Sequence, residues 1–130
     1  RKSEQPADAV LAKSTLRYSD MATPQGLKDV ASYAHGVGPS KTYILPNTQP
    51  VTPTSFVNDA HAVGLKVHPY TLRPENNFLP DYLDCSAIAA EKCEKGALAE
   101  FEIFFKAGVD GVFTDDPALG RQAADAFFKK

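Results

Sequence analysis

The sequence lacks the features that mark several classes of protein. It has no tryptophan, one methionine and two cysteines, and its 14 basic residues are outnumbered by 16 acidic ones. No cluster of lysines and arginines interleaved with aromatic residues occurs, so nucleic acid is a poor candidate partner. No apolar run approaches the roughly 20 residues of a membrane-spanning helix. A CxxC pair, a glycine-rich phosphate loop and a GxSxG nucleophile motif are also absent from the sequence.

The remaining composition is that of an ordinary folded domain. Of the 130 residues, 43% are apolar and 23% are charged, and the net charge is -2. This length predicts one domain at most, with a modest core. The chain begins without methionine, and its polar first residues are not followed by the apolar stretch of a signal peptide. We therefore expect a processed or excised piece of a longer protein.

One unit recurs along the chain, namely a helix, a glycine, a short apolar strand and then polar residues. Threonine followed by proline, at Thr23 and at Thr52, predicts the start of the first two helices. Gly64 and Gly108 predict the ends of the second and third helices. Asp116, before a proline, predicts the N-cap of a last helix. The helices are expected at about residues 23–34, 52–63 and 97–107, and the strands at 35–40, 65–71 and 111–114.

The alternation of strands and helices indicates the fold class. Strands separated by helices of 10 to 15 residues are typical of right-handed βαβ units and a parallel sheet, so the class is α/β. A (β/α)8 TIM barrel needs about 250 residues, so the three units would form a partial barrel. A lone three-stranded parallel sheet would leave its edges and one face bare. We therefore expect the folded protein to contain more chain, and residues 74–95 to form an inserted loop over the active-site face.

Candidate functional residues follow the predicted strands, because the carboxyl ends of barrel strands carry the active site. Lys41 and Arg73 could face an anionic substrate oxygen such as a phosphate, although from the residues alone a solvated lysine and a structural arginine–aspartate pair are favoured over that role. His68 is a candidate acid or base, or a hydrogen-bonded histidine of the barrel interior. Asp115 could ligate a cation, orient another side chain or accept backbone N–H groups. Tyr70 lies on the same predicted rim, next to Thr71.

Other ionisable residues have simpler interpretations. His61 lies towards the polar side of its helix and is expected to be solvated, and His35 is expected to be structural. Glu100 and Glu102 are expected on the surface of their helix.

The two cysteines, Cys85 and Cys93, lie eight positions apart in a segment that the sequence suggests is helical. In one straight helix they would be about 12 Å apart at 1.5 Å per residue, which is beyond disulfide reach. A disulfide would require the segment to turn between them. Both a disulfide in an exported protein and two buried thiols remain open.

Three segments together resemble a known family. The stretches "YAHGVGPSK", "GLKVHPYTLR" and "KAGVDGVFTDDP" resemble the carboxy-terminal part of bacterial glycerophosphodiester phosphodiesterases, particularly the periplasmic type. The resemblance covers residue 23 to the end, apart from the insertion. It implies a (β/α)8 barrel whose sixth to eighth strands are these three, and hydrolysis of glycerophosphodiesters to glycerol 3-phosphate and an alcohol. It also implies a divalent cation, usually calcium or magnesium, and a periplasmic or secreted location.

The resemblance also implies what this chain does not contribute. The family's catalytic histidines, including a His-Arg pair, and its Glu-x-Asp metal ligands have no counterpart in the sequence. This chain alone is therefore expected to be inactive, with the amino-terminal portion of the enzyme as its partner. Within the chain, the resemblance favours Lys41, His68, Tyr70, Thr71, Arg73 and Asp115 as the substrate-binding rim. Two departures concern that rim: His35 replaces an expected acidic residue, and Asp116 replaces an aromatic one.

Two other functions fit part of the sequence. A catalytically inactive half-barrel could serve as a binding or assembly module that covers its sheet with a partner. A different barrel phosphoesterase, such as a phosphatidylinositol-specific phospholipase, is the other alternative, and the "HPYT" segment argues against it.

Overall fold

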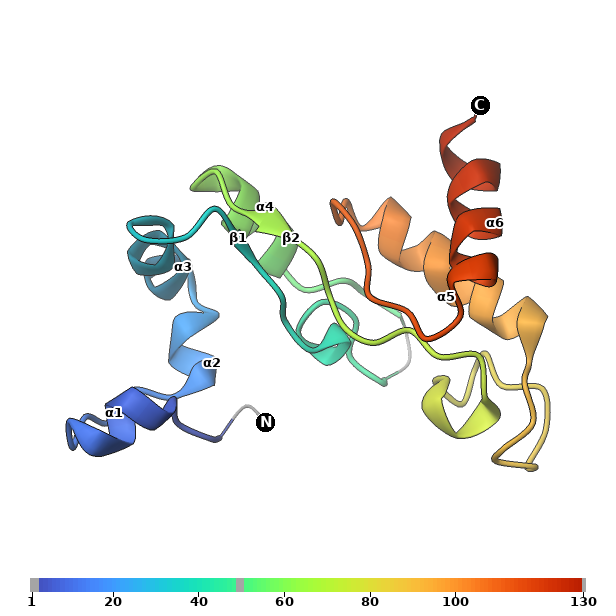
Figure 1. The fold of residues 1–130 in the computed structure, drawn as a ribbon, viewed down its shortest axis with the longest axis horizontal. Coiled ribbons are helices and arrows are strands. Elements are labelled where there is room, and N and C mark those ends of the chain that lie inside the picture. The colour runs from blue at the N-terminus through green and yellow to red at the C-terminus, as the bar shows by residue number, and fades with distance from the viewer. Residues whose placement is uncertain (1–2, 49–50, 130) are drawn as a thin grey trace.

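The computed structural model describes residues 3–48 and 51–129, which fold into short strands flanked by helices (Figure 1). Two parallel strands lie at the centre, the amino-terminal helices α1 and α2 lie at one end, and α5 and α6 lie at the other. Among the described residues, no helix combines the length and the apolar character needed to cross a bilayer. The helices are α1 (Ala7–Leu11), α2 (Tyr18–Met21), α3 (Pro24–Ala31), α4 (Phe56–Ala62), α5 (Glu94–Lys106) and α6 (Pro117–Phe128). The strands are β1 (Gly36–Val37) and β2 (Lys66–Val67), and two 3-10 turns are η1 (Lys41–Tyr43) and η2 (Asn76–Phe78).

The sheet is parallel, as the alternation of elements predicted, but its regular part is short. β1 pairs with β2, with Gly36 opposite Lys66 and Val37 opposite Val67. Beyond these residues the segments that follow β1 and β2 pair again at one isolated parallel bridge, between Ser40 and Tyr70. The prolines that follow each strand have no N–H to donate, which limits a regular ladder.

The third predicted strand, residues 111–114, is not a regular strand in the structure. Its segment still runs parallel to β2 and its continuation, because the amides of Asp110 and Phe113 donate to the carbonyls of Val67 and Pro69 over 2.9 and 3.0 Å. A single parallel bridge joins Leu72 to Thr114. The α/β class is therefore confirmed, whereas three complete β/α units are not.

Two helix starts are confirmed in detail. The hydroxyl of Thr23 accepts from the amide of Gly26 over 3.1 Å, and Pro24 opens α3. The carboxylate of Asp116 accepts from the amide of Leu119 over 3.1 Å, and a proline opens α6. Both caps satisfy an amide that has no partner within its helix.

The other two helices begin elsewhere than predicted. α4 begins at Phe56 rather than after Thr52, because the preceding threonine, Thr54, is tied to η1: its amide donates to the carbonyl of Ile44 over 2.8 Å. α5 begins at Glu94, three residues before the predicted start, which also shortens the inserted loop. The predicted ends hold, since Gly64 and Gly108 adopt φ of 81° and 94°, a region that favours glycine. Residues 49 and 50 of the loop before α4 lie outside the described residues.

The core lies between the helices and one face of the strands. Along β2 and its continuation, side chains alternate between buried and exposed, so Leu65, Val67 and Pro69 face the helices. His68 and Tyr70 lie on the opposite, exposed face. The most deeply buried large side chains are Phe101, Phe104, Leu27, Ile44, Leu65, Leu72 and Val67. α5 supplies the two phenylalanines, so this helix anchors the core beneath the strands.

The inserted loop is a folded turn and not the helical segment that the sequence suggested. Its two arms pair at an antiparallel bridge between Glu75 and Lys92. Cys85 and Cys93 form a disulfide with their Cα atoms 5.5 Å apart, because the chain reverses between them. The amide side chain of Asn76, which is buried, accepts from the amide of Cys85 over 2.9 Å and donates to the carbonyl of Ile88 over 2.9 Å. Asn76 thus supplies the hydrogen bonds that fix the reversal.

Candidate functional site

The carboxyl ends of the strands bring several polar side chains together. Tyr70 and Thr71 follow β2, and Thr114 and Asp115 follow the parallel segment beside it. With Phe113 they line an open hollow of about 400 Å³. The peptide bond between Tyr70 and Thr71 is cis. Three of the predicted rim residues therefore share one surface, and backbone hydrogen bonds to the neighbouring segment hold them there.

Thr114 was not predicted as a site residue, and its hydroxyl makes hydrogen bonds within the protein. It donates to the carbonyl of Leu72 over 2.8 Å and accepts from the amide of Asp116 over 3.1 Å. The hydroxyl thus fixes the start of α6 against the continuation of β2. Tyr70 and Thr71 line the hollow beside Thr114.

Arg73 lies between an aromatic ring and an acid, Asp115, that lines this hollow. Its Nε is 2.8 Å from Oδ2 of Asp115, and its Cζ lies 4.6 Å from the ring centre of Phe78. The Nε atom is buried and its N–H does not point at the carboxylate, so the contact is an ion pair without a directed hydrogen bond. The side chain as a whole is 39% exposed, which leaves the guanidinium within reach of a ligand.

Lys41 is not placed as the substrate-facing cation that the sequence predicted. Its ammonium donates to both carboxylate oxygens of Glu100, over 3.2 and 2.9 Å, and to the carbonyl of Phe78 over 2.8 Å. An ammonium has three N–H donors, so all of them are used. Lys41 instead links η1, the inserted loop and α5.

The prediction that Glu100 lies on the helix surface is wrong, because its side chain is buried. Its side chain is 3% exposed. Burial raises the pKa of Glu100 above its ordinary value, and the charge and hydrogen bonds of Lys41 oppose that rise. The sequence held a signal for this position, since Glu100 lies in the apolar stripe formed by Ala97, Phe101 and Phe104. Its partner, 59 positions away, gave no such signal.

The histidines occupy three different environments. His68 lies on the exposed face, with its ring edge-on to Phe113 at 6.5 Å. Its backbone amide donates to the carbonyl of Val37 over 3.0 Å, and its ring makes no hydrogen bond to the described residues. A Cβ atom at Gly111 would lie 3.1 Å from Nε2 of His68, so the glycine allows this close approach. His68 therefore lies on the strand face opposite the helices, which is the face that lines the interior of a barrel, and its role as an acid or base or as an interior histidine stays a prediction. His35 is exposed, and its carbonyl accepts from Lys66 over 3.0 Å.

His61 is paired rather than simply solvated. Its Nε2 is 2.7 Å from Oδ2 of Asp110, which also accepts from the amide of Val67 over 2.9 Å. Burial alone would raise the pKa of Asp110, but the hydrogen bonds from His61 and Val67 outweigh it and hold that pKa below its ordinary value. This cluster joins the end of α4 to the amino-terminal end of the parallel segment, away from the hollow.

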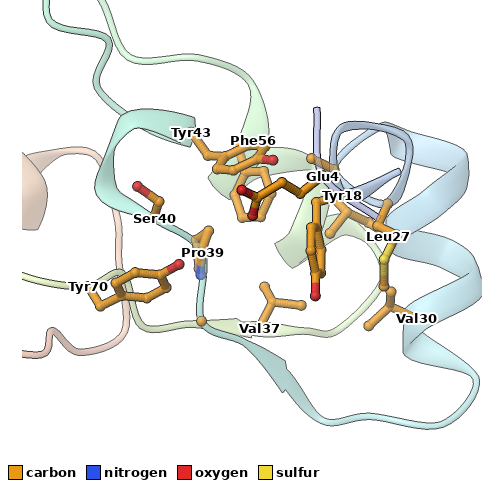
Figure 2. A pocket seen from close by; sticks show the side chains of 13 residues that line it. Glu4, Tyr18, Leu27, Val30, Val37, Pro39, Ser40, Tyr43, Phe56 and Tyr70 are labelled. Atoms are coloured by element: carbon orange, nitrogen blue, oxygen red, sulfur yellow. The ribbon is translucent and has the colours of Figure 1, made fainter. Parts of the chain in front are cut away.

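A second pocket, of about 440 Å³, opens beside the end of β1 (Figure 2). Tyr70 and Ser40 form one wall, and the apolar side chains of Leu27 and Val30 form the other. Burial, and then the neighbouring Tyr70, raise the pKa of Tyr43 at the top of the pocket, so its hydroxyl stays protonated. Tyr70 lines both the pocket and the hollow, and therefore lies between the two spaces.

The described residues do not group into a metal site. Within residues 3–48 and 51–129, no three side chains of histidine, cysteine, aspartate or glutamate are grouped so that they could hold an ion. Asp115 is instead paired with Arg73. The donor set of the rim therefore does not fit a complete site for calcium or magnesium.

Comparison with known proteins gives a consistent result. Residues 3–119 match the glycerophosphoryl diester phosphodiesterase family. One curated relative, glycerophosphodiester phosphodiesterase GDPD6 of Arabidopsis thaliana, is 37% identical to the chain over 110 residues. The alignment covers 82% of this chain but only 27% of the relative, so the chain spans about a quarter of the length of the curated relative it matches.

Proposed function

We propose, because the chain belongs to the glycerophosphoryl diester phosphodiesterase family, that it is part of an enzyme that hydrolyses glycerophosphodiesters to glycerol 3-phosphate and an alcohol. The family match over residues 3–119 is the observation that carries the proposal. The family has a TIM-barrel fold, and two parallel strands flanked by helices are consistent with part of such a barrel. In this proposal the chain supplies the carboxy-terminal part of the barrel and the substrate-facing rim.

The rim residues have chemically distinct tasks in this proposal. Arg73 would meet an anionic oxygen of the phosphodiester, since a guanidinium matches phosphate geometry with two parallel N–H donors. Tyr70 would pack against the glycerol or the leaving alcohol, and Thr71 would offer a hydroxyl to the same group. Asp115, paired with Arg73 at 2.8 Å, would orient the guanidinium. His68 would shape the floor of the site from the exposed strand face.

The acid–base groups of the reaction would come from the amino-terminal portion of the enzyme. Two histidines there would transfer protons to and from the reacting oxygens. The divalent cation implied by the family resemblance would neutralise charge on the phosphoryl group and would be held mainly by that portion. The disulfide between Cys85 and Cys93 supports a periplasmic or secreted location, as in the bacterial periplasmic type.

The proposal is tested with the full-length enzyme that contains this chain. Release of glycerol 3-phosphate is measured from glycerophosphocholine and from glycerophosphoethanolamine, with calcium or magnesium supplied. We expect turnover of at least one substrate and an increase in KM of about tenfold or more for Arg73→Ala, since charge-assisted hydrogen bonds contribute about 1.5 to 3 kcal/mol. Absence of glycerol 3-phosphate release under all these conditions would refute the proposal. Unchanged kinetics of Arg73→Ala would remove this residue from the site.

A further inference from the structure

We propose that Phe78, in the inserted loop, is a positioning residue that holds the guanidinium of Arg73 beside Asp115, a residue that lines the hollow. This inference rests on the proposed function, because it assigns Arg73 to an anionic substrate oxygen. Phe78 lines neither the hollow nor the pocket. It would therefore act through Arg73 and not by touching the substrate.

The two contacts of Arg73 constrain its side chain from different sides. The ring of Phe78 lies 4.6 Å from Cζ, and the carboxylate of Asp115 lies 2.8 Å from Nε. An arginine side chain loses up to about 2 kcal/mol of rotamer entropy when it is ordered. Contacts already present in the free enzyme remove part of that loss from substrate binding, which is the basis of pre-organisation. The Nη atoms remain available for a bidentate contact with an anion.

Phe78 is itself fixed by contacts that the rest of the loop provides. Its carbonyl accepts from the ammonium of Lys41 over 2.8 Å, and that ammonium is bound to the buried carboxylate of Glu100. Phe78 ends η2, whose first residue, Asn76, holds the reversal closed by the disulfide. These contacts fix the backbone of the inserted loop at Phe78, so the ring of Phe78 is held next to Arg73.

The exposure of Phe78 argues against a purely structural role. Its side chain remains 40% exposed, and the residue does not belong to the hydrophobic core. Shortening the ring should therefore change the free energy of unfolding little. The ring of Phe78 does contact the guanidinium of Arg73, and this contact can serve a function that the core does not require.

The test uses the full-length enzyme with glycerophosphocholine as substrate, and glycerol 3-phosphate as a ligand in titration calorimetry. Phe78→Leu should raise KM and the Kd of glycerol 3-phosphate about two- to fivefold, the effect expected for an exposed cation–π contact, with kcat unchanged within about twofold. Phe78→Trp keeps an aromatic ring at this position, so KM and the Kd of glycerol 3-phosphate should stay close to their wild-type values. In the Arg73→Ala background, Phe78→Leu should have no further effect, since the ring acts through the guanidinium. Phe128→Leu, on α6 and also exposed, is the matched control and should change neither constant.

The outcomes separate this inference from the proposed function. A wild-type enzyme that binds glycerol 3-phosphate but hydrolyses no glycerophosphodiester would overturn the proposed function, and the Kd values would still test Phe78. Equal Kd values for wild type and Phe78→Leu, or an equal loss in the Arg73→Ala background, would overturn the positioning role. A wild-type enzyme that neither hydrolyses nor binds would overturn both.

Discussion

Removal of Lys41 should destabilise the protein, and the loss should depend on pH. In Lys41→Met the carboxylate of Glu100 stays 3% exposed without its counter-ion, whereas the apolar stem of the side chain at position 41 is largely preserved. Breaking a buried ion pair by removing one partner costs about 3 to 5 kcal/mol. Because Lys41 is itself 18% exposed, part of the pair is solvated already. We therefore expect a loss of about 2 to 4 kcal/mol at pH 8.

The pH dependence follows from the raised pKa of Glu100. Burial raises this pKa, and Lys41 opposes the rise, so Lys41→Met should raise it further. A carboxyl whose pKa is raised by folding binds its proton more tightly in the folded state. Its contribution to stability is full below the unfolded value near 4.5 and is lost as the pH rises through the folded value. The destabilisation by Lys41→Met should therefore be smaller at pH 5 than at pH 8.

Urea unfolding of the full-length protein at these two pH values is the assay. Lys66→Met is the matched control, because Lys66 is 73% exposed and its nitrogen lies 3.8 Å from Asp110, so little change is expected. The double variant Lys41→Met/Glu100→Leu should recover most of the stability, since replacing a whole buried pair by apolar groups is close to neutral. An equal loss at both pH values, with no recovery in the double variant, would show that packing and not charge determines the effect.

Three further changes give simpler tests by unfolding of the same protein. Replacing Cys85 and Cys93 by serine should lower stability by roughly 2 to 3 kcal/mol, as expected for a loop with a sequence separation of 8, and a reductant should then have no added effect. Asp110→Ala should cost about 1.5 to 3 kcal/mol at neutral pH. Burial raises the pKa of Asp110, but the hydrogen bonds from His61 and from a backbone N–H outweigh it and lower that pKa. The stability difference between wild type and Asp110→Ala should therefore shrink as the pH falls below 3.8, and a loss that does not depend on pH would contradict this role of Asp110. Thr23→Ala should cost about 1 kcal/mol and Thr23→Ser much less; equal losses would argue against the cap.

Local signals allowed the sequence to predict the helix caps. Thr23 and Asp116 each act on an amide three positions away, so the residues that make the contact lie within one short stretch. The same signal was wrong at Thr52, because Thr54 is bound to η1, a segment ten positions earlier. A capping motif predicts a helix start only where no distant segment competes for its polar groups.

Long-range partners explain most of what the sequence could not predict. The acid that binds Lys41 lies 59 positions away, and nothing near either residue identifies the other. The third predicted strand is absent for a related reason, since residues 111–114 pair at one bridge, with Leu72, which lies 42 positions before Thr114. The fold of the inserted loop depends on the side chain of Asn76, a residue without any distinctive local pattern. The alternation of elements, in contrast, was sufficient for the α/β class.

Burial of the acidic partner distinguishes the two predicted rim cations. Lys41 is bound to a carboxylate that is almost fully buried, and releasing it would leave that charge without a partner, at a cost of several kcal/mol. Arg73 is bound to Asp115, which is 55% exposed, and an exposed pair contributes about 0 to 1 kcal/mol. A phosphate oxygen can therefore displace or share the partner of Arg73 at little cost, but it cannot compete for Lys41. On this argument we propose Arg73, and not Lys41, as the rim cation that would bind substrate, whereas Lys41 holds the loop carrying Phe78 in place.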